Sequence, residues 1–366
     1  MGFRCGIVGL PNVGKSTLFN ALLRTQAAQA ANYPFCTIEP NIGRVAVPDS
    51  RLSALARISK SEKTLATQIE FVDIAGLVRG ASKGEGLGNK FLANIREVEA
   101  VVHVLRCFID DDITHVEGGI DPVRDAEIVE TELMLADLDS LERRATQAEK
   151  RARGGDAEAK AALPLMEQAL AALRDGKAAR TCPAAKTEPE KFKQLQLLTA
   201  LPVLYVANVS EADAASGNAY SAAVAKRAAE EGAAHIVVAA AIEAEISLLA
   251  EDSERAEYLA SLDLKESGLD RLARAGYALL DLVTFLTTGP KETRAWTIPR
   301  GMRAQDAAGT IHTDISRGFI AAEVIPFADF IAAGGEAQAK AQGKMRLEGR
   351  DYIVQDGDVV LFRFNV

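Results

Sequence analysis

Near the start of the chain, residues 9–17 read GLPNVGKST, a glycine turn followed by a lysine and two hydroxyl side chains. Gly9 and the Gly14-Lys15-Ser16 triplet have the spacing of a loop that binds nucleotide phosphates. Glycines let successive backbone N–H groups point inward at phosphate oxygens. Lys15 would place its charge on the β- and γ-phosphates, and Ser16 its hydroxyl on Mg²⁺. The segment therefore predicts a P-loop that binds a nucleoside triphosphate with Mg²⁺.

Three later residues have the types that complete such a site. Thr37 lies in a proline-containing loop, where its hydroxyl and carbonyl are expected to reach Mg²⁺ and the attacking water. Asp73 ends an expected strand, and a carboxylate there can hold the water shell of Mg²⁺. The backbone N–H of Gly76 can sense the γ-phosphate. Glycines are frequent from 76 to 88, so this segment is costly to order, and we expect ligand contacts to set its state.

Short apolar segments that alternate with helical ones must position these residues. The strands are expected at 3–8, 68–74, 100–108, 202–207 and 235–240, and the helices at about 16–23, 212–231 and 244–286. A P-loop needs a buried strand before it and a helix after it, and the first strand and first helix meet that requirement. The whole pattern predicts an α/β fold with a doubly wound, mainly parallel sheet.

Two further modules are expected beside that sheet. Helical periodicity runs over about 121–153, is broken by two glycines, and resumes over 157–174. This predicts an inserted antiparallel hairpin that resembles a coiled coil. The basic residues near its tip are either a contact for RNA or an acidic partner, or an ordinary solvated helix face. From 293 onward, short alternating segments separated by turn residues predict a small β-rich module.

The composition indicates a protein with an ample core and an acidic surface. Of the 366 residues, 48% are apolar and 25% charged, and the net charge of −9 disfavours indiscriminate nucleic-acid binding, so no DNA partner is expected. No signal peptide and no bilayer-spanning apolar run is apparent, so no membrane contact is expected. Four scattered cysteines indicate neither disulfides nor a zinc site. A cytoplasmic location is expected.

The combination of motifs is more specific than the P-loop alone. Residues 9–17, the run NYPFCTIEPN at 32–41, the run DIAGLVRG at 73–80, the run NVSE at 208–211 and the terminal module resemble the YchF / Obg-like ATPase family. The resemblance covers essentially the whole length and implies association with ribosomes, with the large subunit and ribosomal RNA as contacts. No pattern suggests an obligate dimer, so a monomer is expected. The implied domains are a G domain at 1–282 with a helical coiled-coil insertion at about 122–200, and a C-terminal TGS domain of β-grasp type at 283–366.

The base-recognition motif departs from that of ordinary GTPases. Those enzymes use Asn-Lys-x-Asp, whose aspartate accepts two hydrogen bonds from guanine, whereas here Val209 replaces the lysine and the longer Glu211 replaces the aspartate. The longer side chain should not align its carboxylate with the two hydrogen-bond donors of guanine. Main-chain groups around Val209 can instead pair with the acceptor and the donor of adenine. Unpaired buried polar groups penalise the wrong base, so we expect ATP to be preferred over GTP, as the resemblance also implies.

The group that orients the attacking water is also absent from its usual place. Ras-like enzymes carry a glutamine directly after Asp-x-x-Gly, and here that position is Leu77. His115 is a candidate replacement, because a neutral imidazole can orient or deprotonate water near pH 7. The alternative is a surface histidine held by the acidic run 110–112. Asn12 has two interpretations as well: an oxygen ligand of a K⁺ ion at the phosphates, or a rigid element of the loop.

Three functions stay open on the sequence: a slow ATP-controlled switch, a nucleotide-stabilised ribosome- or RNA-binding module without a productive cycle, and a GTPase with relaxed base choice. The first is favoured. Its expected catalytic residues are Lys15 and His115, and its expected Mg²⁺ ligands are Ser16, Thr37 and Asp73. The expected nucleotide contacts are Asn12, Val13, Gly14, Lys15, Ser16, Thr17, Gly76, Asn208, Val209 and Glu211.

Overall fold

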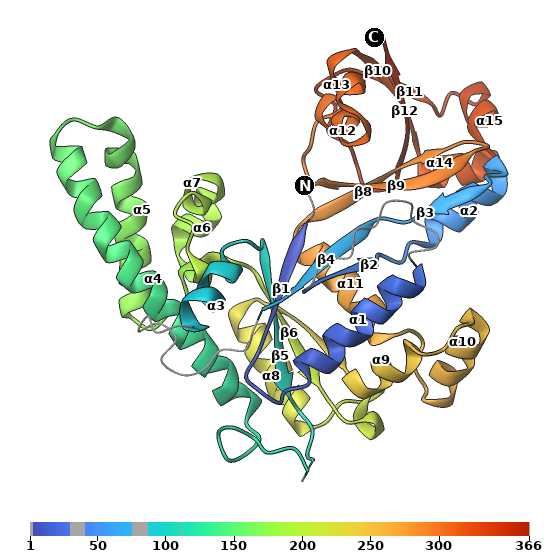
Figure 1. The fold of residues 1–366 in the computed structure, drawn as a ribbon. Helices are drawn as coiled ribbons and strands as arrows, with labels where there is room; N and C mark the ends of the chain where they lie inside the picture. The colour runs from blue at the N-terminus through green and yellow to red at the C-terminus, as the bar shows by residue number, and fades with distance from the viewer. Residues whose placement is uncertain (1–2, 30–40, 75–86, 111, 366) are drawn as a thin grey trace. The chain divides into compact units, whose positions relative to one another are not determined.

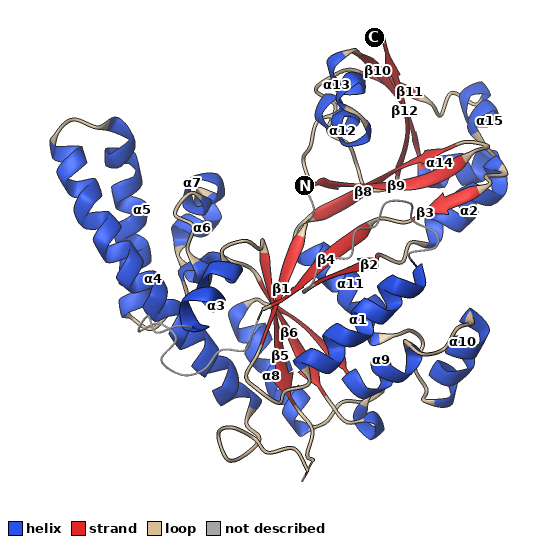
Figure 2. Cartoon of the chain, in the orientation of Figure 1, coloured by secondary structure: helices blue, strands red, loops and turns tan. Residues whose placement is uncertain are grey.

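The computed structural model describes residues 3–29, 41–74, 87–110 and 112–365. The chain forms two compact units, whose elements are drawn in Figures 1 and 2. None of the described helices is long and apolar enough to cross a membrane. The first unit consists of residues 1–45 and 70–279, and the second of residues 46–69 and 280–366.

The first unit is built on a six-stranded sheet in the order β2-β4-β1-β5-β6-β7. The strand pairs from β4 through β1, β5 and β6 to β7 are all parallel, so the carboxyl ends of these strands meet at one edge. The central strand β5 is buried along its whole length, as expected when helices cover both faces. The bounds are β1 Arg4–Val8, β2 Ile42–Ala46, β4 Gln68–Asp73, β5 Ala100–Arg106, β6 Val203–Asn208 and β7 Ala234–Val238.

Helices cover this sheet from two sides. Figure 1 shows α4 and α8 on one side and α1 and α11 on the other. Local capping accounts for several of their ends: α8 begins with a capping box formed by Asn218 and Ser221, and stops where Gly232 adopts a left-handed conformation with φ 65°. The bounds are α1 Lys15–Gln29, α3 Leu87–Ile95, α8 Ala219–Glu231, α9 Ala240–Ile246, α10 Asp252–Ser261 and α11 Gly268–Leu279.

The predicted helical hairpin is present in the first unit. Helix α4 spans Pro122–Arg153 and α5 spans Ala157–Arg174, and Figure 2 shows them side by side. Each has an aspartate N-cap whose side chain accepts a backbone hydrogen bond, Asp121 for α4 and Asp156 for α5. Their facing sides bury small and aliphatic side chains, which continue into the short helices α6 (Pro183–Thr187) and α7 (Pro189–Lys193).

The second unit contains a mixed sheet in the order β11-β10-β12-β8-β9-β3. One apolar cluster lies under α12 and a second involves α2 and α14. Strand β12 is antiparallel to β10 and parallel to β8, and β8 and β9 form an antiparallel hairpin. The bounds are α2 Ser50–Ser59, β3 Lys63–Leu65, β8 Leu282–Thr288, β9 Glu292–Pro299, α12 Ala304–Ile311, α13 Thr313–Arg317, β10 Phe319–Pro326, α14 Phe327–Ala333, α15 Glu336–Ala341, β11 Arg346–Glu348 and β12 Asp358–Phe364.

Two features of the second unit differ from the sequence-based expectation. The helical region expected to reach residue 286 was too long, because 282–288 form strand β8. This stretch, LVTFLTT, is rich in β-branched and aromatic residues, which favour a strand. The segment 46–69 was not assigned to the C-terminal module, but β3 pairs with β9 and α2 buries Leu52 and Leu55 in that module's core.

Candidate functional site

The P-loop occupies the turn between β1 and α1, as the sequence predicts. Helix α1 begins at Lys15, and Leu18 closes its first turn by donating to the carbonyl of Gly14 at 3.0 Å. Gly14 has φ 89°, a conformation that side chains rarely adopt, and a Cβ added there would collide with the amide of Asn208. A Cβ on Gly9 would lie 2.6 Å from the carbonyl oxygen of Val104. Both glycines are therefore required by the local fold.

A cavity of about 760 Å³ opens beside this loop, a volume within the range of small-molecule sites. Its walls come from the segments that follow β1, β5, β6 and β7, which share the carboxyl edge of the sheet, where α/β proteins bind ligands. The lining residues are Leu10, Pro11, Asn12, Gly14, Lys15, Ser16, Thr17, Phe108, Ile109, Asp110, Ile113, Asn208, Val209, Ser210, Ala240 and Ala241.

Lys15 and Asp73 form an ion pair at the carboxyl ends of β1 and β4. Both side chains are largely shielded, with exposed fractions of 11% and 21%. Ser16 lies beside Lys15 on the cavity wall, so a hydroxyl and a carboxylate are available close to the lysine. Such hard oxygen donors, few in number, suit Mg²⁺, which usually keeps several waters and takes further oxygens from phosphates. The residues present therefore fit a magnesium ion bound together with a triphosphate.

The side chain of Asn208 forms hydrogen bonds with two walls of the cavity. It is 4% exposed, its amide nitrogen donates to the carbonyl of Val13 at 2.9 Å, and its oxygen accepts from the amide of Ala240 at 2.9 Å. The side chain thus ties the P-loop to the start of α9. Both of these hydrogen bonds are made within the fold, which makes Asn208 a positioning residue for the cavity.

The three residues that follow Asn208 differ in what they contribute to the cavity. The amide of Val209 donates to the carbonyl of Val238 at 2.9 Å, so this N–H is already paired. Ser210 lines the cavity, and its hydroxyl bonds to Asp213 at 2.9 Å. Glu211 is exposed and is not among the lining residues. The geometry leaves the carbonyl of Val209 as the main-chain group of that residue that can meet a base.

The loop after β5 is held by Arg106, which sequence reasoning did not single out. This arginine is 2% exposed and donates to the carbonyls of Phe108 at 3.2 Å, Asp110 at 3.1 Å and Ile113 at 2.9 Å. Its guanidinium carbon also lies 4.7 Å from the centre of the Phe108 ring, a cation–π contact. Arg106 therefore shapes the apolar wall that this loop contributes to the cavity.

His115 lies further along the same loop and is directed toward helix α4. Its Nε2 is 2.8 Å from the carboxylate of Asp125, and its Nδ1 accepts the N–H of Glu117 at 3.1 Å. An accepting Nδ1 places the proton on Nε2, which then donates to Asp125. The described carboxylate partner of His115 is Asp125 and neither Asp110 nor Asp112, and His115 is not among the described residues that line the cavity.

Asn12 connects the His115 loop to the P-loop. Its backbone is left-handed, with φ 64°, and its amide nitrogen donates to the carbonyl of Thr114 at 3.0 Å. This contact brings the residue beside His115 against the P-loop. Thr37, Gly76 and Leu77 lie outside the described residues, so their expected roles stay predictions.

Most of the cavity residues missed by sequence reasoning have apolar side chains, and the polar exceptions are Asp110 and Ser210. Phe108, Ile109 and Ile113 follow β5, and Ala240 and Ala241 begin the helix after β7. The signal that points to them is topological: loops that follow adjacent parallel strands meet at one edge of the sheet.

Comparison with known proteins places the chain among close relatives. Residues 4–143 match a family described as "50S ribosome-binding GTPase", and residues 282–365 match the C-terminal family of YchF GTPases, described as "Protein of unknown function (DUF933)". Proteins named "Ribosome-binding ATPase YchF" are 58% identical in Haemophilus influenzae and 52% identical in Bacillus subtilis, each covering all of both chains. The solved structure of the Schizosaccharomyces pombe YchF GTPase is 35% identical, with a TM-score of 0.89 over 99% of this chain and 98% of that one. The predicted fold class is confirmed.

Proposed function

The chain belongs to the YchF family of P-loop nucleoside triphosphatases, and from this we propose that it is a ribosome-associated ATPase whose slow hydrolysis cycle works as a switch. The observation that carries this proposal is the cavity at the P-loop, which Lys15 and Ser16 line, with Asp73 paired to Lys15 and apolar side chains forming a separate wall for a base. In this proposal the domains are those of the family, a G domain over 1–282 with the insertion at 122–200 and a TGS domain over 283–366, and residues 46–69, although they fall within the first range, complete the sheet and core of the TGS module. The protein acts as a cytoplasmic monomer.

The phosphate end of the site is assigned to the P-loop. Backbone N–H groups at Val13 and Gly14 face the phosphates, and the ammonium of Lys15 exchanges Asp73 for the β- and γ-phosphate oxygens when nucleotide binds. Ser16, Asp73 and Thr37 would hold Mg²⁺, with Thr17 beside them, and the ion would supply neutralisation of phosphate charge. The N–H of Gly76 is assigned to the γ-phosphate. Asn12 is assigned to the phosphate region, where its oxygen is available to a K⁺ ion because its nitrogen is bonded to Thr114.

The base end of the site supports adenine. The carbonyl of Val209 can accept a hydrogen bond from the 6-amino group of adenine, whereas the O6 of guanine would face it acceptor to acceptor. Glu211 is exposed, so it does not form the buried carboxylate clamp that guanine requires. The aromatic ring of Phe108 and the side chains of Ile109 and Ile113 offer an apolar surface to the base.

Comparison of ATP and GTP binding on one purified sample tests this base preference. We expect ATP to bind about 10- to 100-fold more tightly than GTP, because one unpaired polar group costs about 1–3 kcal/mol. Calorimetric titration of both nucleotides with Mg²⁺ present measures the ratio. Replacing Glu211 with aspartate should leave ATP affinity unchanged if the side chain is not a base contact. Equal or tighter GTP binding would instead identify a GTPase with relaxed base choice.

The water-orienting role is assigned to His115, whose loop lies against the P-loop through Asn12. In this assignment the imidazole exchanges Asp125 for the attacking water when nucleotide is bound. We expect His115→Ala to lower kcat about 10²-fold while ATP affinity is kept, since positioned proton-transfer groups contribute about 10²–10⁴-fold. Steady-state phosphate release measures kcat, and His312→Ala, at an exposed histidine, is the matched control. Unchanged turnover in His115→Ala would remove this residue from the mechanism.

Ribosome association is proposed from the names of the relatives and from the helical hairpin. Arg143 and Arg153 near its tip are 70% and 82% exposed, although each lies near an acidic residue one turn away. These guanidinium groups can contact ribosomal RNA of the large subunit, because single ion pairs at the surface are weak and exchange readily. Cosedimentation of the full chain with ribosomes, with ATP or ADP present, tests the association.

A further inference from the structure

The sheet of the second unit contains an opening between two of its strands. Strand β12 is aligned with β10 from Asp358 to Phe364, but its alignment with β8 is confined to one pair, Val359 with Leu286. Strand β8 is the next strand in the sheet order, but among the described strands residues 360–364 are aligned with β10 and not with β8. A strand edge without a neighbour presents backbone N–H and C=O groups that another strand can pair with.

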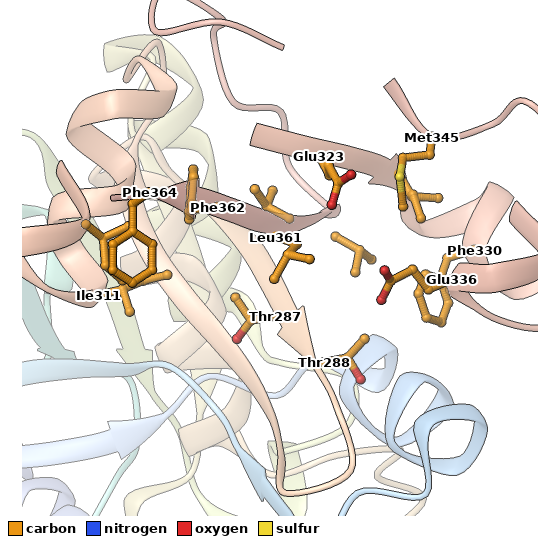
Figure 3. Close-up of a pocket in the computed structure, with 14 residues that line it drawn as sticks. Thr287, Thr288, Ile311, Glu323, Phe330, Glu336, Met345, Leu361, Phe362 and Phe364 are labelled. Carbon is orange, nitrogen blue, oxygen red and sulfur yellow. The ribbon is translucent and has the colours of Figure 1, made fainter. Parts of the chain in front are cut away.

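A cavity of about 200 Å³ lies in this opening, and Figure 3 shows Thr287 and Thr288 across from Leu361. Most of its lining is aliphatic or aromatic, contributed by β10, β12 and the helices beside them. Leu361 is 52% exposed and Phe364 is 43% exposed, so two large apolar side chains of β12 face solvent. A cavity of this size can hold one aromatic or branched aliphatic side chain of a ligand.

The charge of the opening is negative. The described residues that line it include Glu323 and Glu336 and no lysine, arginine or histidine. Glu323 is already paired with Arg363, but Glu336 is exposed and its carboxylate has no hydrogen bond or ion pair with any described residue. Figure 3 shows both carboxylates directed toward the same space. Such a surface repels a phosphate backbone and attracts lysine or arginine.

We propose that this opening binds an extended, basic segment of a ribosomal protein, which adds a strand along residues 360–364. Main-chain hydrogen bonds would supply affinity, while an apolar side chain in the cavity and a basic one at Glu336 would supply specificity. The proposal rests on the ribosome association proposed above and names the kind of partner that this part of the chain contacts. In this proposal the opening contacts a ribosomal protein, whereas the helical hairpin is expected to contact ribosomal RNA.

Site-specific photocrosslinking identifies the occupant. A benzoylphenylalanine residue in place of Leu361, in the full chain bound to ribosomes, should crosslink to a basic segment of a ribosomal protein. The same group in place of Leu248, which is 69% exposed and belongs to the first unit, is the control for nonspecific capture. Crosslinks to ribosomal RNA alone, to a second copy of this chain, or to nothing while the chain cosediments would each overturn the proposal.

Two substitutions give an independent readout. Leu361→Asp and Glu336→Lys should each weaken ribosome binding about tenfold in cosedimentation, because each removes one recognition element. Turnover without ribosomes should stay at the wild-type level, since neither residue lines the P-loop cavity. If wild type does not cosediment, the ribosome association itself fails and this inference fails with it. If wild type binds and both variants bind equally well, the association stands and the docking site is wrong.

Discussion

Replacing Lys15 with methionine should lower the turnover of nucleoside triphosphate by about 10²–10³-fold, the usual effect of removing one group that stabilises transition-state charge. The ammonium group lies at the start of α1, its side chain is only 11% exposed, and among the described residues it forms an ion pair with Asp73. When nucleotide is bound, this charge is the one that the P-loop aims at the phosphates. Phosphate-release kinetics measure the loss of turnover, and calorimetric titration with ATP measures the affinity for the nucleotide.

The control for this experiment is Lys226→Met, which removes a lysine that is 79% exposed on α8 and weakly paired with Glu230. Its turnover should equal that of wild type. Thermal unfolding without nucleotide separates a catalytic effect from loss of the fold. A Lys15→Met protein that hydrolyses ATP at the wild-type rate would mean that the P-loop cavity is not the catalytic site.

The Lys15→Met protein also distinguishes a switch from a passive binding module. A switch requires nucleotide to change the affinity for the partner, because a ligand shifts an equilibrium only through its differential affinity for two states. We therefore expect the variant to lose the difference in ribosome binding between ATP and ADP. Binding that is indifferent both to nucleotide and to Lys15 would favour the module without a productive cycle.

Replacing Arg106 with methionine should destabilise the fold by about 3 kcal/mol and weaken ATP binding about tenfold. Its three carbonyl partners would lose donors that carry a charge, and such hydrogen bonds contribute about 1.5–3 kcal/mol each when they cannot be replaced by water. Water can reach part of this loop, because Ile109 is 71% exposed, so the total is smaller than the sum. Urea unfolding and ATP titration measure the two effects.

Arg106→Lys is the informative comparison, because it keeps the charge but not the planar group that reaches three carbonyls and covers the Phe108 ring. It should fall between wild type and Arg106→Met in both measurements. Arg143→Met, at a surface position that is 70% exposed, should have little effect on either. If Arg106→Met keeps full stability and full ATP affinity, the loop after β5 is held by other contacts and Arg106 does not shape the cavity.

The P-loop could be recognised from sequence because its conformation depends on neighbouring residues. Gly14 adopts a positive φ, and Lys15 begins a helix within the same short segment, so residue type and spacing are sufficient. Strands β4, β5, β6 and β7 were predicted on the same local basis, from short apolar runs, whereas β2 was not. The hairpin was predicted from its helical period, and two aspartate N-caps mark where its helices begin.

Other parts of the site depend on residues that are distant in the chain. Asn208 bonds to Val13, 195 positions away, and residue type alone does not reveal that both of its amide groups are used inside the fold. Arg106 reads as one more residue of an apolar strand, because its partners are carbonyl oxygens, which every residue possesses. The apolar wall at Phe108 and Ile109 has no signature beyond its place after β5.

In the second unit too, local sequence predicts several strands but not how those strands pair. Residue type and alternation predict that β9, β10 and β12 are strands, but not that β3 joins β9 or that β12 leaves β8 after a single pair. Strand pairing joins segments far apart in sequence, and its register is set by which faces become buried together. Local preference therefore decided where helices, strands and the phosphate loop form, whereas long-range pairing and burial decided which of them meet to make a cavity.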